Sequence, residues 1–180
     1  MEMGLLGMKQ IQYVQNGTNR IIFNLKAQDE FTYTAGLQDK LAKELLTYII
    51  LNEPNPGRRL HSVKLVPIFS QDDEIRMALV ATLLTDGNPG IRPRAVEQLA
   101  NYPADQMIWE AFMKVLLEDR NAVVRMIALN ILAERPHKRL LPVLQIVSHL
   151  NENEFIRDES AAILAEISET IDGRIDEGLE

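Results

Sequence analysis

The chain has 180 residues, of which 46% are apolar, so it is long enough to bury a continuous core. It has no cysteine and no apolar run of the length that a membrane-spanning helix needs, which excludes disulfides and thiolate metal sites, and we expect a soluble protein. The net charge of -7 comes from residues 152–180, which contain ten acidic residues and two arginines, whereas residues 1–151 contain 16 acidic and 17 basic residues. This balance argues against a partner that is bound chiefly through its phosphates.

The first part of the chain has the pattern of β-structure. Residues 1–10 are interpreted as a disordered lead-in or a cloning remnant. In residues 11–36, the pair Asn16-Gly17 is a strong hairpin-turn signal between alternating apolar residues, and residues 31–35 have the pattern of a third strand. A lone hairpin is marginal in water. We therefore expect a β-hairpin or a three-stranded antiparallel sheet that packs its apolar face on the helices that follow.

From residue 37 to residue 168 the sequence repeats. Related residues recur every 33 positions up to residue 150, after which the interval shortens to 32. Each unit contains two segments with apolar residues at three- and four-residue spacing, which is typical of helices with one buried stripe. The predicted fold class is therefore all-α after the small sheet, with about four helix pairs at residues 38–69, 70–103, 104–136 and 137–168.

The turn inside each helix pair has a fixed chemistry. Asn55 and Asn88 each precede a proline. At the start of a helix an Asn side chain can accept a backbone N–H that has no intrahelical partner, and a Pro in the first helical position has no N–H that needs one. This places the second helices at about 56–68, 89–101, 122–134 and 154–168. An acidic residue and an arginine stand six residues apart around the turn, and because every repeat has them we interpret them as a structural ladder. Its members are Glu53, Arg59, Asp86, Arg92, Asp119, Arg125, Asn151 and Arg157, with Asn151 breaking the acidic series.

Small residues three positions after each arginine predict close approach of neighbouring helices. They are Ser62, Ala95, Ala128 and Ser160. One turn later we expect core positions at Val66, Leu99, Leu132 and Leu164. Pro93, near the fifth position of its helix, is expected to distort the first turn, and Arg58 stands where the other repeats have Ile or Val. Residues 169–180 are expected to be an acidic, frayed tail because Gly173 and Gly178 interrupt the apolar pattern.

The units resemble HEAT repeats, which are antiparallel helix pairs with an acid in the turn and an arginine in the second helix; this resemblance covers about residues 38–168 and implies a right-handed α-solenoid. The stretches "EFTYTAGLQDK", "LLTYIILNEPNPGRRLHSVKLV" and "LLTDGNPGIRPRAVEQL" also resemble the soluble C-terminal region of bacterial zinc-finger anti-sigma-factor-like membrane proteins, over about residues 10–168. That resemblance implies an interaction or sensory domain outside the cytoplasmic membrane, preceded by a zinc module and a membrane helix. Without it, the chain would be assigned to the cytoplasm. The sequence contains no Cys/His zinc ligands, so no zinc role is carried over.

The predicted function is a non-enzymatic protein-binding scaffold, without a catalytic, cofactor or metal site. No Ser/His/Asp order or phosphate-binding loop is recognised, and the three histidines are not spaced for a metal. Stacked helix pairs form an extended surface lined by their second helices. Positions one, two and five after each arginine therefore predict the partner-binding face, with His61, Lys64, Arg94, Glu97, Met126, Ile127, Asn130, Asp158 and Glu159 as its main residues.

DNA binding or repair is the alternative, since some helical-repeat proteins are alkylpurine DNA glycosylases that hold the duplex in a basic groove. Here the predicted face is mixed in charge, and Trp109 lies among apolar neighbours where we expect a core role. A third class, a lyase or chaperone for chromophore attachment, has no residue to support it. These features favour a protein partner over nucleic acid.

Overall fold

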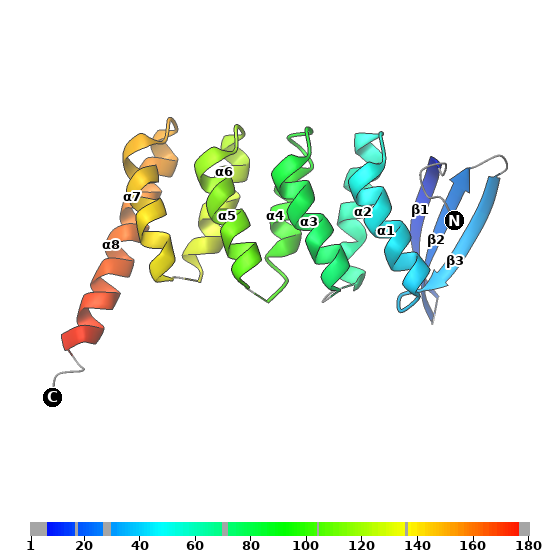
Figure 1. Cartoon of the computed structure of the whole chain (residues 1–180), viewed down its shortest axis with the longest axis horizontal. Coiled ribbons are helices and arrows are strands. Elements are labelled where there is room, and N and C mark those ends of the chain that lie inside the picture. Colours follow the sequence, from blue (N-terminus) through cyan, green and yellow to red (C-terminus); the bar gives the residue numbers. More distant parts are fainter. Residues whose placement is uncertain are drawn as a thin grey trace. The chain divides into compact units, whose positions relative to one another are not determined.

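The protein is mostly helical, with a small antiparallel sheet at its N-terminus (Figure 1), which confirms the broad prediction from the sequence. It divides into two compact units, residues 1–103 and 104–180, and each is described by itself. The structure is a computed structural model that describes residues 7–16, 18–26, 30–69, 72–103, 105–135 and 137–176.

The sheet of the first unit consists of β1 (Gly7–Asn16), β2 (Thr18–Lys26) and β3 (Glu30–Gly36) in the order β1-β2-β3. All neighbours are antiparallel, and Ile21 of β2 pairs with Tyr13 on one side and Ala35 on the other. The alternating residues Ile21, Phe23 and Leu25 are buried, and β1 lies against α2. The predicted hairpin and third strand are therefore confirmed, while Gly17 of the predicted turn lies outside the described residues.

Strand β1 begins earlier than the sequence pattern indicated. Residues 7–10, which we had assigned to the lead-in, belong to the strand, and Gly7 pairs with Lys26 of β2. Pairing of the main chain gives these residues hydrogen-bond partners, which composition alone does not reveal. The remaining residues of the predicted lead-in, 1–6, lie outside the described part of the chain.

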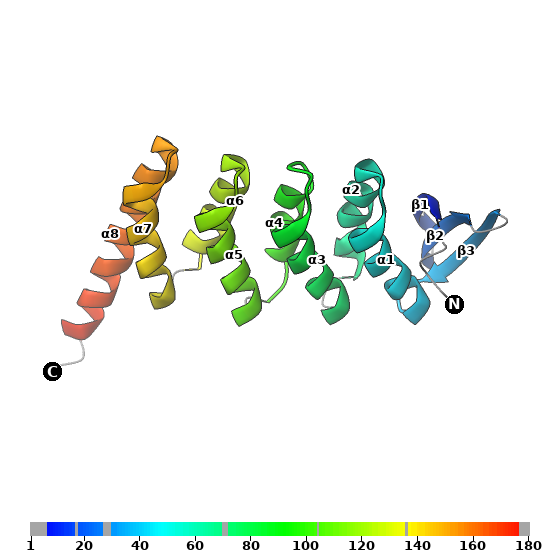
Figure 2. The ribbon, with the colours of Figure 1, turned by 45° about the horizontal axis from the view of Figure 1, so that its top comes forward.

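Two helix pairs complete the first unit. The helices are α1 (Lys40–Asn52), α2 (Pro56–Leu65), α3 (Asp73–Thr85) and α4 (Arg92–Leu99), with a 3-10 turn, η2 (Val66–Phe69), after α2. Asp39 and Asp72 cap α1 and α3 by accepting main-chain N–H groups. Within this unit the pairs stack in register, since α1 lies beside α3 and α2 beside α4 (Figure 2).

The second unit repeats this arrangement. Its helices are α5 (Gln106–Glu118), α6 (Ala122–Ala133), α7 (Leu141–Leu150) and α8 (Glu154–Asp176), with a 3-10 turn, η3 (Lys138–Leu140), before α7. Here α5 lies beside α7 and α6 beside α8. Both hairpin turns, α5–α6 and α7–α8, are at the same end of the unit (top of Figure 1).

Close packing of the second helices depends on their small residues. Ser62, Ala95, Ala128 and Ser160 are each fully buried, as the repeat pattern predicted. The positions one turn later, Val66, Leu99 and Leu132, are buried as well. Leu164 departs from the prediction: it is only half-buried, and Ile163 and Ile167 occupy the core of α8 instead.

Two helix boundaries differ from the sequence prediction. Helix α4 begins at Arg92 rather than 89, because residues 89–91 form a turn in which Ile91 N–H donates to the Asn88 carbonyl. Pro93 therefore lies in the first turn of α4, where no intrahelical bond is lost. Helix α8 continues to Asp176, so residues 169–176 of the predicted frayed tail are helical, while its residues 177–180 lie outside the described part of the chain. A single Gly in a helix costs only about 1 kcal/mol relative to Ala, which is too little to end it.

Candidate functional site

The turn inside each helix pair is closed by its arginine. The guanidinium donates from Nη1 to the main-chain carbonyl of the residue six positions earlier, which is the C-cap residue of the preceding helix. Carbonyls at a helix end have no intrahelical hydrogen-bond partner, and the arginine supplies one. The four bonds are Arg59 to Glu53 at 2.7 Å, Arg92 to Asp86 at 2.9 Å, Arg125 to Asp119 at 2.6 Å and Arg157 to Asn151 at 2.7 Å. We call this contact the turn clasp, and it accounts for the fixed six-residue spacing.

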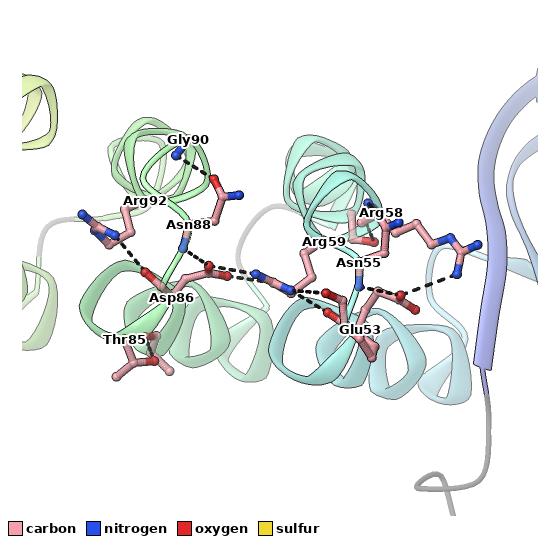
Figure 3. Close-up of polar contacts among 12 residues, drawn as sticks. Glu53, Asn55, Arg58, Arg59, Thr85, Asp86, Asn88, Gly90 and Arg92 are labelled. Carbon is pink, nitrogen blue, oxygen red and sulfur yellow. Dashed lines mark hydrogen bonds and ion pairs between the residues drawn. The ribbon is translucent and has the colours of Figure 1, made fainter. Parts of the chain in front are cut away.

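The side chain of the C-cap residue has a separate role. Its oxygen accepts the main-chain N–H two residues later, at 3.0 Å for Glu53, 2.8 Å for Asp86, 2.8 Å for Asp119 and 3.0 Å for Asn151. The residue that donates this N–H is an Asn in every repeat. Its own side chain accepts N–H groups further along, at the start of the second helix for Asn55, which accepts from Gly57 and Arg58, and in the turn before α4 for Asn88, which accepts from Gly90. Figure 3 shows both interactions in the first two turns. The turn residues are thus engaged in local structure.

Neighbouring turns of the first unit are joined by a charged pair. Arg59 donates from Nε to Asp86 Oδ2 at 2.8 Å and from Nη2 to Asp86 Oδ1 at 3.0 Å, so the contact is bidentate (Figure 3). Both side chains are largely buried, and the hydrogen bond to Asp86 raises the pKa of Arg59 above its usual value. Arg58 is exposed and lies 3.6 Å from Glu53, whereas Ile91, Val124 and Ile156 at its position are buried.

The second unit uses a different acid for the corresponding pair. Arg125 Nη2 donates to Glu152 Oε1 at 3.0 Å, and not to the predicted ladder residue Asn151. Asn151 Oδ1 is taken by the main chain, and the other end of an amide is a donor that cannot accept from a guanidinium. Arg125 Nε is buried and has no hydrogen-bond partner among the described residues. The sequence pattern had missed Glu152, which stands one position out of register.

The predicted partner-binding face lies on the second helices. In the first unit His61 and Lys64 of α2 and Arg94 of α4 are exposed, while Glu97 of α4 is half-buried and accepts a hydrogen bond from Arg94. In the second unit Asn130 and Asp158 are exposed, and the half-buried members are Met126, Ile127 and Glu159. All nine side chains therefore reach solvent, in two groups that belong to separate units.

Trp109 is not in the core, which corrects the sequence prediction. It is half-buried, its ring centroid lies 5.7 Å from that of the exposed His137, and it lines a shallow pocket of about 280 Å³. The pocket is lined by Asp105, Gln106, Trp109, Glu110, Met113, His137 and Arg139. Residue-by-residue periodicity could not have revealed this, because the fully buried Leu116 lies only about 20° from Trp109 around the helix.

Polar side chains of this pocket are engaged in local hydrogen bonds on and beside α5 and η3. Gln106 Nε2 donates to Glu110 Oε1 at 2.7 Å, Asp105 caps α5 by accepting from Ile108 N–H at 2.9 Å, and His137 Nδ1 accepts from Arg139 N–H at 3.1 Å. The contacts of Asp105 and His137 are caps like those of the other helices.

A polar cluster joins α1, α3 and the end of α4 in the first unit. Lys43 Nζ lies 2.8 Å from Asp72 Oδ2, while Asp72 Oδ1 accepts from the N–H groups of Glu74 and Ile75. Burial alone would raise the pKa of Asp72, but the hydrogen bonds from Lys43 and from the main chain outweigh it and hold that pKa below its usual value. Burial raises the pKa of Tyr102 to about 12, and the negative charge of Asp72 adds to this.

Within the described ranges, no group of three or more His, Cys, Asp or Glu side chains is placed to hold a metal ion. In the same part of the chain, no helix is both long and apolar enough to cross a bilayer. No family model, curated protein or solved structure matches the chain.

Proposed function

We propose that the protein is a non-enzymatic scaffold that binds another protein through the exposed face of its second helices. The observation that carries the proposal is the contrast between adjacent positions: Ser62, Ala95, Ala128 and Ser160 are fully buried, whereas the nine predicted face residues on the same helices all reach solvent. In this proposal the helix pairs form a right-handed solenoid of HEAT type. The chain is the interaction or sensory domain of a bacterial anti-sigma-like membrane regulator.

The charge of the face supports a protein partner over duplex DNA. His61, Lys64 and Arg94 stand on the first unit, but Glu97 accepts a hydrogen bond from Arg94, and Asp158 and Glu159 make the last helix acidic. Duplex binding draws most of its affinity from several Lys and Arg at phosphates. Filter binding of duplex DNA at low salt tests the alternative, and saturable binding there would favour it.

The test of the main proposal is a double variant on the face. Arg94→Glu with Ile127→Asp should weaken the affinity for a partner captured with the wild-type chain by about 100-fold, because a buried apolar anchor and a charge contact are both lost. The matched control is Met77→Asp with Lys114→Glu, which changes exposed side chains on the first helices α3 and α5. Unchanged affinity in the face variant, with a native circular dichroism spectrum, contradicts the proposal.

The membrane-regulator part has its own test, which is the coding region immediately upstream. An apolar run of about 20 residues preceded by clustered Cys and His would support it. An upstream region that encodes no such run would contradict it and leave the scaffold proposal standing.

A further inference from the structure

The turns of the second unit expose four large apolar side chains. Leu117 and Val123 flank the α5–α6 turn, and Leu150 and Phe155 flank the α7–α8 turn. Their exposed fractions are 40%, 49%, 79% and 56%. We call these four residues the turn edge. Because α5 lies beside α7 and α6 beside α8, with both turns at one end of the unit, the equivalent positions of the two turns are neighbours (Figures 1 and 2).

The first unit lacks half of this apolar surface. Leu51 and Leu84 occupy the places of Leu117 and Leu150, but Gly57 and Gly90 stand where the second unit has Val123 and Phe155. A Cβ at either glycine would lie 3.1–3.2 Å from the Oδ1 of the Asn two residues earlier, while Val123 at the same position donates its N–H to Asn121 Oδ1 at 2.9 Å, so the turn accepts a side chain here without requiring one. Val123 and Phe155 also contribute little to the core, because about half of each is exposed. The fold therefore gives no reason for them.

The rim of the turn edge is acidic. Residues 117–123 and 150–155 contain Glu118, Asp119, Glu152 and Glu154 against Arg120, a sum of -3, which Arg125 and Arg157 reduce to -1 because they bond to the same turns. These two arginines are not exposed, so the exposed charges of the rim are Glu118, Glu152 and Glu154 against Arg120. Glu152 is paired with Arg125 through one oxygen but is itself exposed, as are Glu118 and Glu154. An apolar patch with an acidic rim is complementary to a segment that presents apolar side chains flanked by Lys or Arg. It is not complementary to an anionic membrane or to a second copy of this edge, which carries the same charge.

We propose that the turn edge binds an amphipathic segment of a partner protein, with large apolar side chains on one face and basic residues beside them. The proposal rests on the scaffold function above and adds a second contact, at the turns instead of the second-helix face. The apolar side chains of the segment would cover Phe155 and Leu150, and its basic residues would meet Glu118 and Glu154.

The test uses fluorescein-labelled amphipathic peptides and fluorescence anisotropy with the full chain. Three peptides share one helical pattern of about five turns: one has Leu and Lys, one has Leu and Glu, and one has Ser in place of Leu. We expect only the Leu/Lys peptide to bind, with a Kd on the order of 10–100 μM. Leu150→Ser with Phe155→Ser should weaken binding at least about 10-fold. Glu118→Gln with Glu154→Gln should weaken it less and reduce its salt dependence.

The matched control is Leu51→Ser with Leu84→Ser, the equivalent exposed leucines of the first unit, which should leave the affinity unchanged. No saturable binding of the Leu/Lys peptide, or equal binding of the Leu/Glu peptide, overturns the proposal. So does loss of binding in Arg94→Glu with Ile127→Asp but not in the turn-edge variant, a result that leaves the scaffold function intact and moves the contact to the second-helix face. A dimer in sedimentation that the turn-edge substitutions abolish would assign the edge to a second copy and overturn the proposal as well.

Discussion

Arg59 binds the carbonyl of Glu53 in its own turn and the carboxylate of Asp86 in the next turn, with three of its nitrogens bonded at 2.7 to 3.0 Å. One side chain thereby closes a hairpin and fixes its distance from the neighbouring hairpin of the first unit. Because both partners of the charged pair are largely buried, removal of one charge leaves the other buried without its hydrogen-bonded counter-charge.

Asp86→Asn should therefore lower the free energy of unfolding by about 3 kcal/mol, although the amide oxygen can still accept the Asn88 N–H. Urea denaturation followed by circular dichroism measures this. Asp73→Asn is the control, because Asp73 pairs with Arg76 while 79% of its side chain is exposed, and it should change stability by less than about 1 kcal/mol. Equal effects of the two substitutions would mean that the Arg59–Asp86 pair contributes no more to the free energy of unfolding than an exposed ion pair does.

The reverse change should stabilise the second unit. Asn151→Asp places a second acceptor oxygen at the position equivalent to Asp86, whose Oδ2 accepts from Arg59 Nε, and the equivalent Nε of Arg125 has no partner among the described residues. We expect a gain of about 1 kcal/mol from satisfying a buried donor with a charged acceptor, reduced by repulsion from Glu152. Asn130→Asp, on the exposed face of α6, is the matched control and should give no gain. A loss of stability in Asn151→Asp would show that the amide is required for the turn.

Ala128 tests the close approach of helices in the second unit. Its side chain is fully buried, so Ala128→Leu should cost about 1 to 3 kcal/mol by overpacking. Thermal unfolding monitored at 222 nm by circular dichroism checks the change. Ala162→Leu on α8, where the side chain is exposed, should be close to neutral. If both leucines are tolerated equally, the small residue has no packing role.

Asp72 should give the first unit a specific dependence on acid. Since its pKa is lower in the folded state than the unfolded value of about 3.9, its contribution to stability is complete above that value and is lost as the pH falls through the folded-state pKa. Asp72→Asn keeps a good helix cap but loses the contact with Lys43. We expect lower stability at about pH 7 and a smaller loss between about pH 5 and pH 2.

Urea denaturation at a series of pH values measures both quantities. Asp158→Asn, which changes an exposed carboxylate of α8, should follow the wild-type pH profile closely. An Asp72→Asn profile parallel to the wild type across the acid range would refute the role assigned to Asp72.

Periodicity in the sequence was sufficient to predict what every repeat shares. The buried small residues and the turns recur because every hairpin packs against its neighbours in the same way. In the sheet, the alternation of Ile21, Phe23 and Leu25 predicted the buried face. The 33-residue interval by itself could not tell which of the recurring positions are buried. Leu51, Leu84, Leu117 and Leu150 keep the 33-residue interval and are all exposed, since a period identifies equivalent positions but not what covers them.

The start of α4, the partner of Arg125 and the exposure of Trp109 depend on contacts of individual residues, which a repeat pattern does not describe. Helix α4 starts late because the Asn88 turn continues through Gly90 and Ile91 before regular helix begins. Glu152 replaced the expected acid because Arg125 has enough reach to bind a carboxylate one residue further on. Trp109 was assigned to the core from its apolar neighbours, and its angular position on α5 does not exclude the core, because the buried Leu116 lies about 20° away.

The turn clasp has a consequence for how such a chain can vary. Glu, Asp and Asn occupy the same corner, yet the guanidinium meets the peptide oxygen at 2.6 to 2.9 Å in all four hairpins. Fastening through the backbone makes the guanidinium contact independent of the identity of that side chain, provided that the side chain keeps an oxygen to accept the main-chain N–H two residues later. Whole hairpins can accordingly be gained, lost or exchanged without redesigning the corner itself.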